Sequence, residues 1–251
     1  MAAHPHRIAE LRKQLEGITA GASRVRGVLP FGVADIDRRL PKGGLALGAL
    51  HEIAGGANGA VSGAAAASFA AGLAARTGGK VLWCYTQPDL YTPALVKSGL
   101  GEDQAVFFEA KDEAAILDCF EEALRHGGLT AVVGELAGLS RVASQRLQMA
   151  AETTGTLAIA IRRWRRQVDA KDFGNPTAAY TRWRVTEVPA ARLPVRGTGR
   201  PRWLLELMRC RGGDCADFEV EASDAKGFVH IPSELADGSA GSEAGRFRAA
   251  N

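Results

Sequence analysis

The chain has 251 residues, 46% of them hydrophobic, enough for one large α/β domain with a substantial core. Its formal net charge of +3 is too small to indicate nucleic-acid binding by itself, and its four cysteines form no C-x-x-C pair, which argues against a metal site or a disulfide scaffold. No signal-peptide pattern begins the chain and its most apolar run, residues 64–75, is too short to span a bilayer, so we expect a cytoplasmic protein with no membrane contact.

The N-terminal segment predicts a short amphipathic helix over residues 7–18. Its apolar positions recur at helical spacing, with charged side chains opposite: Ile8, Leu11, Leu15 and Ile18. This helix either packs on its own domain or forms an arm that binds a partner or a second copy of the chain. We divide the chain into this helix and its linker (1–27), a core (28–236) and a polar tail (237–251) that we expect to be disordered.

A strand, a glycine-rich turn and an alanine-rich helix are predicted over residues 45–75. The candidate loop residues are Gly55, Gly56, Gly59, Ser62 and Gly63. A strand that leads into such a loop at a helix start is where P-loop proteins hold phosphate through backbone N–H groups. That chemistry also needs a lysine, yet no lysine or arginine occurs between Lys42 and Arg76. The pattern therefore predicts a degenerate nucleotide loop.

Further strands and helices alternate along the rest of the core, which favours an α/β fold with a mostly parallel central sheet flanked by helices. A strand and the helix that follows it are expected within 78–101. Further strands are expected within 104–109, 129–140 and 156–161, with helices within 112–127 and 141–151. Residues 200–211 and 218–232 are expected to close the sheet. His51, alone in the opening strand, is expected to be a packing residue rather than a ligand.

Two stretches resemble the RecA-type recombinases. The segment that leads into the opening strand matches their entry motif at Gly32, Ile36, Asp37, Leu40, Gly43, Gly44, Leu45 and Gly48. The tetrapeptide Phe173–Pro176 matches, letter for letter, part of their mobile DNA-binding loop. The resemblance implies a RecA-like P-loop-type core with a degenerate nucleotide site.

The same resemblance locates two further ATP-handling positions. The glutamate that positions the attacking water is replaced by Gln87, a neutral amide that cannot act as a general base. The aspartate that supports magnesium is replaced by Gly134, and Glu135, one residue later, is expected to face the other side of the sheet. We therefore expect no ATPase activity, no cofactor and no metal. The alternative is a divergent ATPase that takes its lysine from elsewhere, such as Lys42 or Lys80.

The second half of the chain is rich in arginine, with twelve arginines and four acidic residues between 161 and 211. Arginine interleaved with aromatic residues is typical of single-stranded DNA binding. The candidate DNA-binding residues are Arg162, Arg163, Trp164, Arg165, Arg166, Phe173, Asn175, Arg182 and Arg184. The competing interpretation is a solvated face, since the alternation Arg182-Trp183-Arg184 suits a strand with one buried side.

The chain resembles the ImuA family in three features: the RecA-type entry motif, the arginine-rich second half and the sequence of residues 202–213. That resemblance implies a non-catalytic accessory protein of DNA-damage-induced translesion synthesis. Its implied partners are an ImuB-like Y-family polymerase homologue, an error-prone DnaE-type polymerase and RecA, with single-stranded DNA and self-association as further expectations. A third interpretation is a purely protein-binding regulator of RecA or of cell division.

Overall fold

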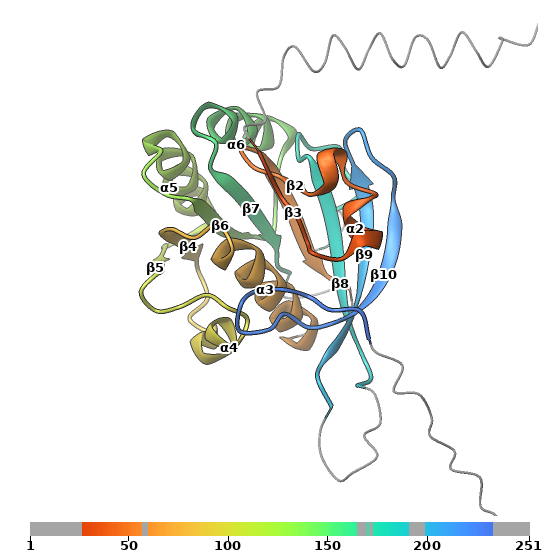
Figure 1. The fold of residues 1–251 in the computed structure, drawn as a ribbon. Helices are drawn as coiled ribbons and strands as arrows, with labels where there is room; N and C mark the ends of the chain where they lie inside the picture. Colours follow the sequence, from red (N-terminus) through yellow and green to blue (C-terminus); the bar gives the residue numbers. More distant parts are fainter. Residues whose placement is uncertain (1–26, 57–59, 165–169, 171–172, 191–198, 233–251) are drawn as a thin grey trace, which may run out of the picture.

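The computed structural model describes residues 27–56, 60–164, 170, 173–190 and 199–232. Within them an eight-stranded sheet is flanked by helices on both faces (Figure 1). Its strands are β3 (Leu50–Gly55), β4 (Val81–Tyr85), β5 (Ala105–Glu109), β6 (Ala131–Leu136), β7 (Leu157–Arg162), β8 (Thr181–Val188), β9 (Arg202–Cys210) and β10 (Ala216–Glu221). The helices are α2 (Ala34–Asp37), α3 (Ala60–Ala75), α4 (Thr92–Lys97), α5 (Glu113–His126) and α6 (Arg141–Thr154). A 3-10 turn, η1 (Pro41–Gly43), and a small pair of strands, β1 (Val28–Leu29) and β2 (Leu45–Ala46), precede the sheet.

The strands lie in the order β10-β9-β8-β3-β7-β6-β4-β5. All neighbours from β8 to β5 are parallel, and β9 and β10 add antiparallel strands at one end. The expected mostly parallel sheet is therefore confirmed. The strand expected over 218–232 is shorter, because the chain leaves the sheet after Glu221 and makes only one further bridge, between Glu221 and His230.

The two faces of the sheet form two apolar clusters because side chains alternate along each strand. Val133 and Ile161 belong to the cluster beneath α3, whereas Val132 and Ala160 belong to the cluster beneath α5 and α6. Five large aromatic side chains fill the first cluster: Phe31, Phe69, Trp83, Trp183 and Trp203. Any side chain on the sheet can therefore be assigned to the α3 face or to the α5–α6 face.

Helix α3 is apolar around most of its circumference, as expected for a helix buried on both sides. Its inner side packs on the sheet, and the segment after β10 crosses its outer side. A Cβ on Gly72 would lie 2.6 Å from Ser223 Oγ and 3.1 Å from the Gly227 carbonyl oxygen, so a larger residue at 72 would force this segment to shift. No helix among the described residues is long and apolar enough to cross a membrane.

The entry motif is a turn held by Asp37. Its two carboxylate oxygens accept hydrogen bonds from the backbone N–H groups of Phe31 and Gly32, at 2.7 and 3.0 Å. Gly32 has a φ of 77°, a conformation that glycine adopts without steric cost. Asp37 therefore fixes the direction in which the chain approaches the sheet.

His51 lies at the centre of a buried chain of hydrogen bonds. Trp183 Nε1–H donates to Thr181 Oγ1 at 2.8 Å, so the Thr181 hydroxyl is left to donate to His51 Nδ1 at 2.7 Å. The other ring nitrogen, Nε2–H, then donates to the Ala46 carbonyl at 2.9 Å. His51 is fully buried, and both nitrogens have partners, which confirms the expected packing role.

Acidification is expected to weaken the fold through His51. Burial lowers its pKa from 6.5 to about 4, so the unfolded chain binds the proton more tightly than the native protein does. The contribution of His51 to the free energy of unfolding is therefore fully present above pH 6.5, and it is lost as the pH falls toward 4. Between pH 7 and pH 5 we expect a loss of about 2 kcal/mol from this group. Urea unfolding of the protein and of His51→Gln at both pH values measures it, and an equal pH dependence in the two proteins would contradict the assignment.

Candidate functional site

The carboxyl ends of the parallel strands are where α/β proteins place ligands, and the predicted nucleotide loop begins there, after β3. Gly55 ends β3, and Gly56 N–H donates to the Val185 carbonyl of β8 at 2.8 Å. A Cβ on Gly56 would lie only 1.6 Å from Thr186 Oγ1. Packing against β8 is therefore sufficient to require glycine at 56, without any bound phosphate.

The other predicted loop residues differ in how far the structure describes them. Gly59 lies outside the described residues, and Ser62 lies in the first turn of α3 with its side chain undescribed. Gly63 lies in the same helix, and a Cβ added there meets nothing within 4 Å. Lys80 directly precedes β4 and donates to the Asp103 carbonyl, so it lies at the opposite, amino end of the strands. This placement gives no support to a lysine supplied from Lys80.

The structure corrects the position assigned to the magnesium-supporting residue. Gly134 faces the α5–α6 cluster, where an added Cβ would lie 2.7 Å from the Phe120 ring. Glu135, not Gly134, points to the face covered by α3, and its Oε1 accepts a hydrogen bond from Trp83 Nε1–H at 2.9 Å. Glu135 is 5% exposed. Gln87, two residues beyond β4, is partly buried.

Arg163 joins three strand ends at this edge. It follows β7 and donates from Nη1 to Glu135 Oε2 of β6 at 2.6 Å. It also makes a two-pronged pair with Asp89, beyond β4, at 2.9 and 2.8 Å. The hydrogen bond from Arg163 holds the pKa of Asp89 below its usual value. For Arg163 itself, burial favours the neutral form, but the two carboxylates outweigh burial and raise its pKa. Both carboxylates are thus bound by one guanidinium from within the chain.

A second ion cluster is buried on the α5–α6 face. Glu52 of β3 accepts from Arg162 Nη1 at 2.9 Å and from Arg182 Nη2 at 3.0 Å, and Thr177 donates to the same carboxylate. The side chains of Glu52 and Arg162 are 0% exposed, and that of Arg182 is 8% exposed. Arg182 Nη2 also donates to the Asn175 carbonyl at 2.8 Å. The cluster ties the loop after β7 to the centre of the sheet.

This burial overturns the DNA-binding role predicted for Arg162 and Arg182, because neither guanidinium is accessible to a phosphate. Arg184 is partly exposed but pairs with Glu206 on the neighbouring strand. Trp183, between Arg182 and Arg184, is fully buried. The alternative interpretation, one buried side and one solvated side, therefore holds for Trp183 and Arg184 but is wrong for Arg182, whose side chain is buried as well. Arg165 and Arg166 lie outside the described residues.

The aromatic members of the predicted set do come together. Trp164 and Phe173 meet edge to face, with ring centroids 5.3 Å apart. Trp164 Nε1–H donates to the Ala137 carbonyl at 3.0 Å, and the Arg182 guanidinium lies 5.2 Å from the Phe173 ring centroid. Asn175 is exposed. The Phe173–Pro176 tetrapeptide is therefore attached to the sheet through the ion cluster.

Glu52 is the residue that sequence reasoning missed. The signal was present, since a carboxylate inside the apolar run 49–54 needs a buried cationic partner. Its partners lie 110 and 130 residues away, and nothing local identifies them.

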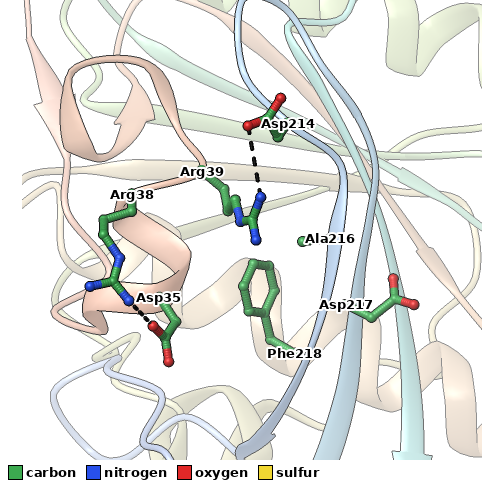
Figure 2. A pocket seen from close by; sticks show the side chains of 7 residues that line it. All are labelled: Asp35, Arg38, Arg39, Asp214, Ala216, Asp217 and Phe218. Atoms are coloured by element: carbon green, nitrogen blue, oxygen red, sulfur yellow. Dashed lines mark hydrogen bonds and ion pairs between the residues drawn. The ribbon is translucent and has the colours of Figure 1, made fainter.

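A cavity of about 470 Å³ lies away from these clusters, between α2 and the β9–β10 turn (Figure 2). Its lining consists of Asp35, Arg38, Arg39, Asp214, Ala216, Asp217 and Phe218. Arg38 pairs with Asp35, and Arg39 lies 3.8 Å from Asp214, in side chains that are at least half exposed. None of the predicted site residues lines it, and its charges are those of a solvated surface.

The fold, with its mostly parallel sheet between layers of helices, defines a RecA-like α/β protein. The crystal structure of the RadB recombinase superimposes with a TM-score of 0.56 at 16% identity, covering 82% of this chain and all of that chain. In sequence, the chain is 36% identical over 241 residues to Protein ImuA of Caulobacter vibrioides, strain NA1000 / CB15N, covering 90% of this chain and 98% of that protein. Protein ImuA of strain ATCC 19089 / CIP 103742 / CB 15 gives the same values. The chain belongs to the ImuA family. No protein-family model matches it.

Proposed function

We propose that this protein is a non-catalytic RecA-like accessory of DNA-damage-induced translesion synthesis, acting by binding other proteins. The partners that membership of the ImuA family suggests are an ImuB-like Y-family polymerase homologue, an error-prone DnaE-type polymerase and RecA. The membership and the RecA-like fold support the process, and the geometry of the sheet supports the mode of action.

The residues at the carboxyl ends of the parallel strands support a role without ATP hydrolysis. Loop residues 55–63 contain no lysine, and Gln87 stands where a base is needed. Arg163 already binds Glu135, the carboxylate on the α3 face. A metal at Glu135 would have to displace this guanidinium, which is itself held by Asp89.

The observation that carries the proposal is the edge strand β5. Among the described strands it pairs only with β4, and three consecutive large apolar side chains are exposed: Val106 at 47%, Phe107 at 38% and Phe108 at 39%. Edge strands are normally protected by charge, proline or a covering segment. The opposite edge strand, β10, shows this protection, with exposed Asp217 and Glu219. An uncovered apolar edge is a surface on which a partner can add a strand.

The backbone of β5 is oriented for such an addition. Ala110 N–H donates to the Tyr85 carbonyl at 2.8 Å, toward β4. Because backbone groups alternate in direction along a strand, the N–H groups of Phe107 and Glu109 point away from β4. A partner strand can therefore gain main-chain hydrogen bonds together with contacts to aromatic side chains on both faces.

Charging this edge is expected to weaken partner binding at least tenfold. The variant is Phe107→Lys/Phe108→Lys, which puts one charge on each face of β5 without touching the core. The matched control is Val142→Lys/Met149→Lys, which charges two exposed apolar residues on α6. Titration of each purified variant with the ImuB-like partner, and sedimentation for self-association, gives the comparison. Equal affinities for the two variants would overturn the role of β5, and the predicted helix at Ile8–Ile18, outside the described residues, would become the surface to test.

A further inference from the structure

Positive charge gathers around the loop at 173–180. Four arginines converge there: Arg162 of β7, Arg182 of β8, Arg209 of β9, and Arg211, which directly follows β9. Glu52 pairs with Arg162 and Arg182. Glu152 contributes a negative charge on the α6 side near Tyr180 and accepts a hydrogen bond from Gln148.

Arg209 and Arg211 are the members without a carboxylate partner in the described part of the chain. Arg209 Nη1 donates to the Thr177 carbonyl at 2.7 Å, and Arg211 Nη2 donates to the Ala178 carbonyl at 3.1 Å. Each arginine therefore keeps further N–H donors for another acceptor. Burial and repulsion from Arg182 and Arg211 lower the pKa of Arg209. An anion beside Arg209 would relieve that repulsion.

The neighbouring arginines on the same half of the sheet behave differently. Arg184 pairs with Glu206, Arg200 with Glu221, and Arg202 with Glu219. Arg209 and Arg211 lie at the same antiparallel end of the sheet, but among the described residues they have no such carboxylate partner. The amino-acid composition therefore cannot tell the paired arginines from the unpaired ones, whereas their ion pairs can.

Aromatic rings and an exposed turn lie beside the unpaired arginines. The Arg211 guanidinium lies 5.4 Å from the centroid of the partly exposed Tyr180 ring. Arg182 connects Phe173, by a cation–π contact at 5.2 Å, to Thr177, whose carbonyl is bound by Arg209. Between them, residues 174–176 are exposed. Guanidinium groups that alternate with aromatic rings suit phosphates and bases, whereas an acidic peptide would need only the cations.

We propose that Arg209 and Arg211, with the ring of Tyr180, bind the phosphate backbone of single-stranded nucleic acid along the exposed turn at residues 174–176. The proposal goes beyond the protein-binding function and does not depend on it. The proposed contact lies at the end of β9 and directly after it, whereas the previously predicted residues Arg162 and Arg182 hold the turn in position.

The test is the salt dependence of binding to fluorescein-labelled oligo(dT), measured by anisotropy. Each phosphate contact contributes roughly 0.7 to the slope of log affinity against log salt for single strands, so Arg209→Gln/Arg211→Gln is expected to lower the slope by about 1.4. The ratio of wild-type to variant affinity then grows about 25-fold over a tenfold decrease in salt concentration. The control Arg184→Gln/Arg200→Gln removes the same formal charge from carboxylate-paired positions and is expected to keep the wild-type slope.

The variant Arg209→Lys/Arg211→Lys distinguishes loss of positive charge from damage to the fold. It keeps both cations, so most of the wild-type salt slope is expected to return. Circular dichroism of all variants confirms that the sheet is intact. A wild-type slope in Arg209→Gln/Arg211→Gln, an equal loss in the control, or binding of an acidic peptide with higher affinity than oligo(dT) would each overturn the proposal. Partner titration of the same variants is expected to be unchanged, so failure here is distinguishable from failure of the protein-binding function.

Discussion

Purified protein is expected to release phosphate from ATP at no more than the background rate, with or without single-stranded DNA. Losing one group that stabilises charge in the transition state costs about 10²–10³ in rate, so the missing lysine and the Gln87 substitution together account for about 10⁴–10⁶. Pairing of Glu135 with Arg163 adds to this loss, because the carboxylate is already occupied. The measurement is steady-state phosphate release at high enzyme concentration.

Gly63→Val is the control for a contaminating ATPase. An added side chain at Gly63 meets nothing within 4 Å, so the fold should be kept while the start of α3 is obstructed. Turnover that persists in this variant belongs to another protein. Turnover that disappears with it would show a working nucleotide site and would contradict the proposed non-catalytic role.

Replacing Glu52 by alanine is expected to lower the free energy of unfolding by about 3–5 kcal/mol, because it removes the buried carboxylate that binds the guanidinium groups of both Arg162 and Arg182. Urea denaturation measures the change. The matched control is Glu219→Ala, which breaks the exposed pair with Arg202 and is expected to cost about 1 kcal/mol or less.

The buried ion cluster of Glu52, Arg162 and Arg182 can also be tested by replacing all three charged side chains. Glu52→Leu/Arg162→Met/Arg182→Met is expected to recover most of the stability, since a buried ion cluster replaced by apolar side chains of similar size is often neutral or better. The loop at 173–180 should then exchange its amide protons faster, because Thr177 has lost its acceptor. If Glu52→Ala lowers the free energy of unfolding no more than Glu219→Ala does, the central role of Glu52 is contradicted.

Much of the fold could be predicted from local patterns. Helix α5 ends where Gly127, with a φ of 72°, takes the left-handed conformation, as its position in the sequence predicts. The alternation at 182–184 also predicted that Trp183 is buried. These features depend on neighbours within a few residues, which is why the sequence is sufficient to show them.

The candidate site could be predicted only in part, because its decisive contacts are long-range. The arginines at 162 and 182 have the same local composition as exposed arginines, and only their pairing with Glu52 buries them. The choice between Gly134 and Glu135 required the direction of each side chain on β6, which a one-residue error reverses. The ion pairs of Arg163 likewise depend on two carboxylates from other parts of the chain, Glu135 on β6 and Asp89 beyond β4.

The unequal edges of the sheet have a consequence for stoichiometry. A sheet that offers the same kind of edge at both ends can join to copies of itself without limit, whereas here β5 is apolar and uncovered and β10 carries exposed acidic side chains. Pairing of β5 with β10 of another copy would bring Phe107 and Phe108 beside Asp217 and Glu219, a poor match in polarity. Strand addition at β5 would therefore saturate at one partner per molecule, and the complex would end growth at that point instead of propagating it.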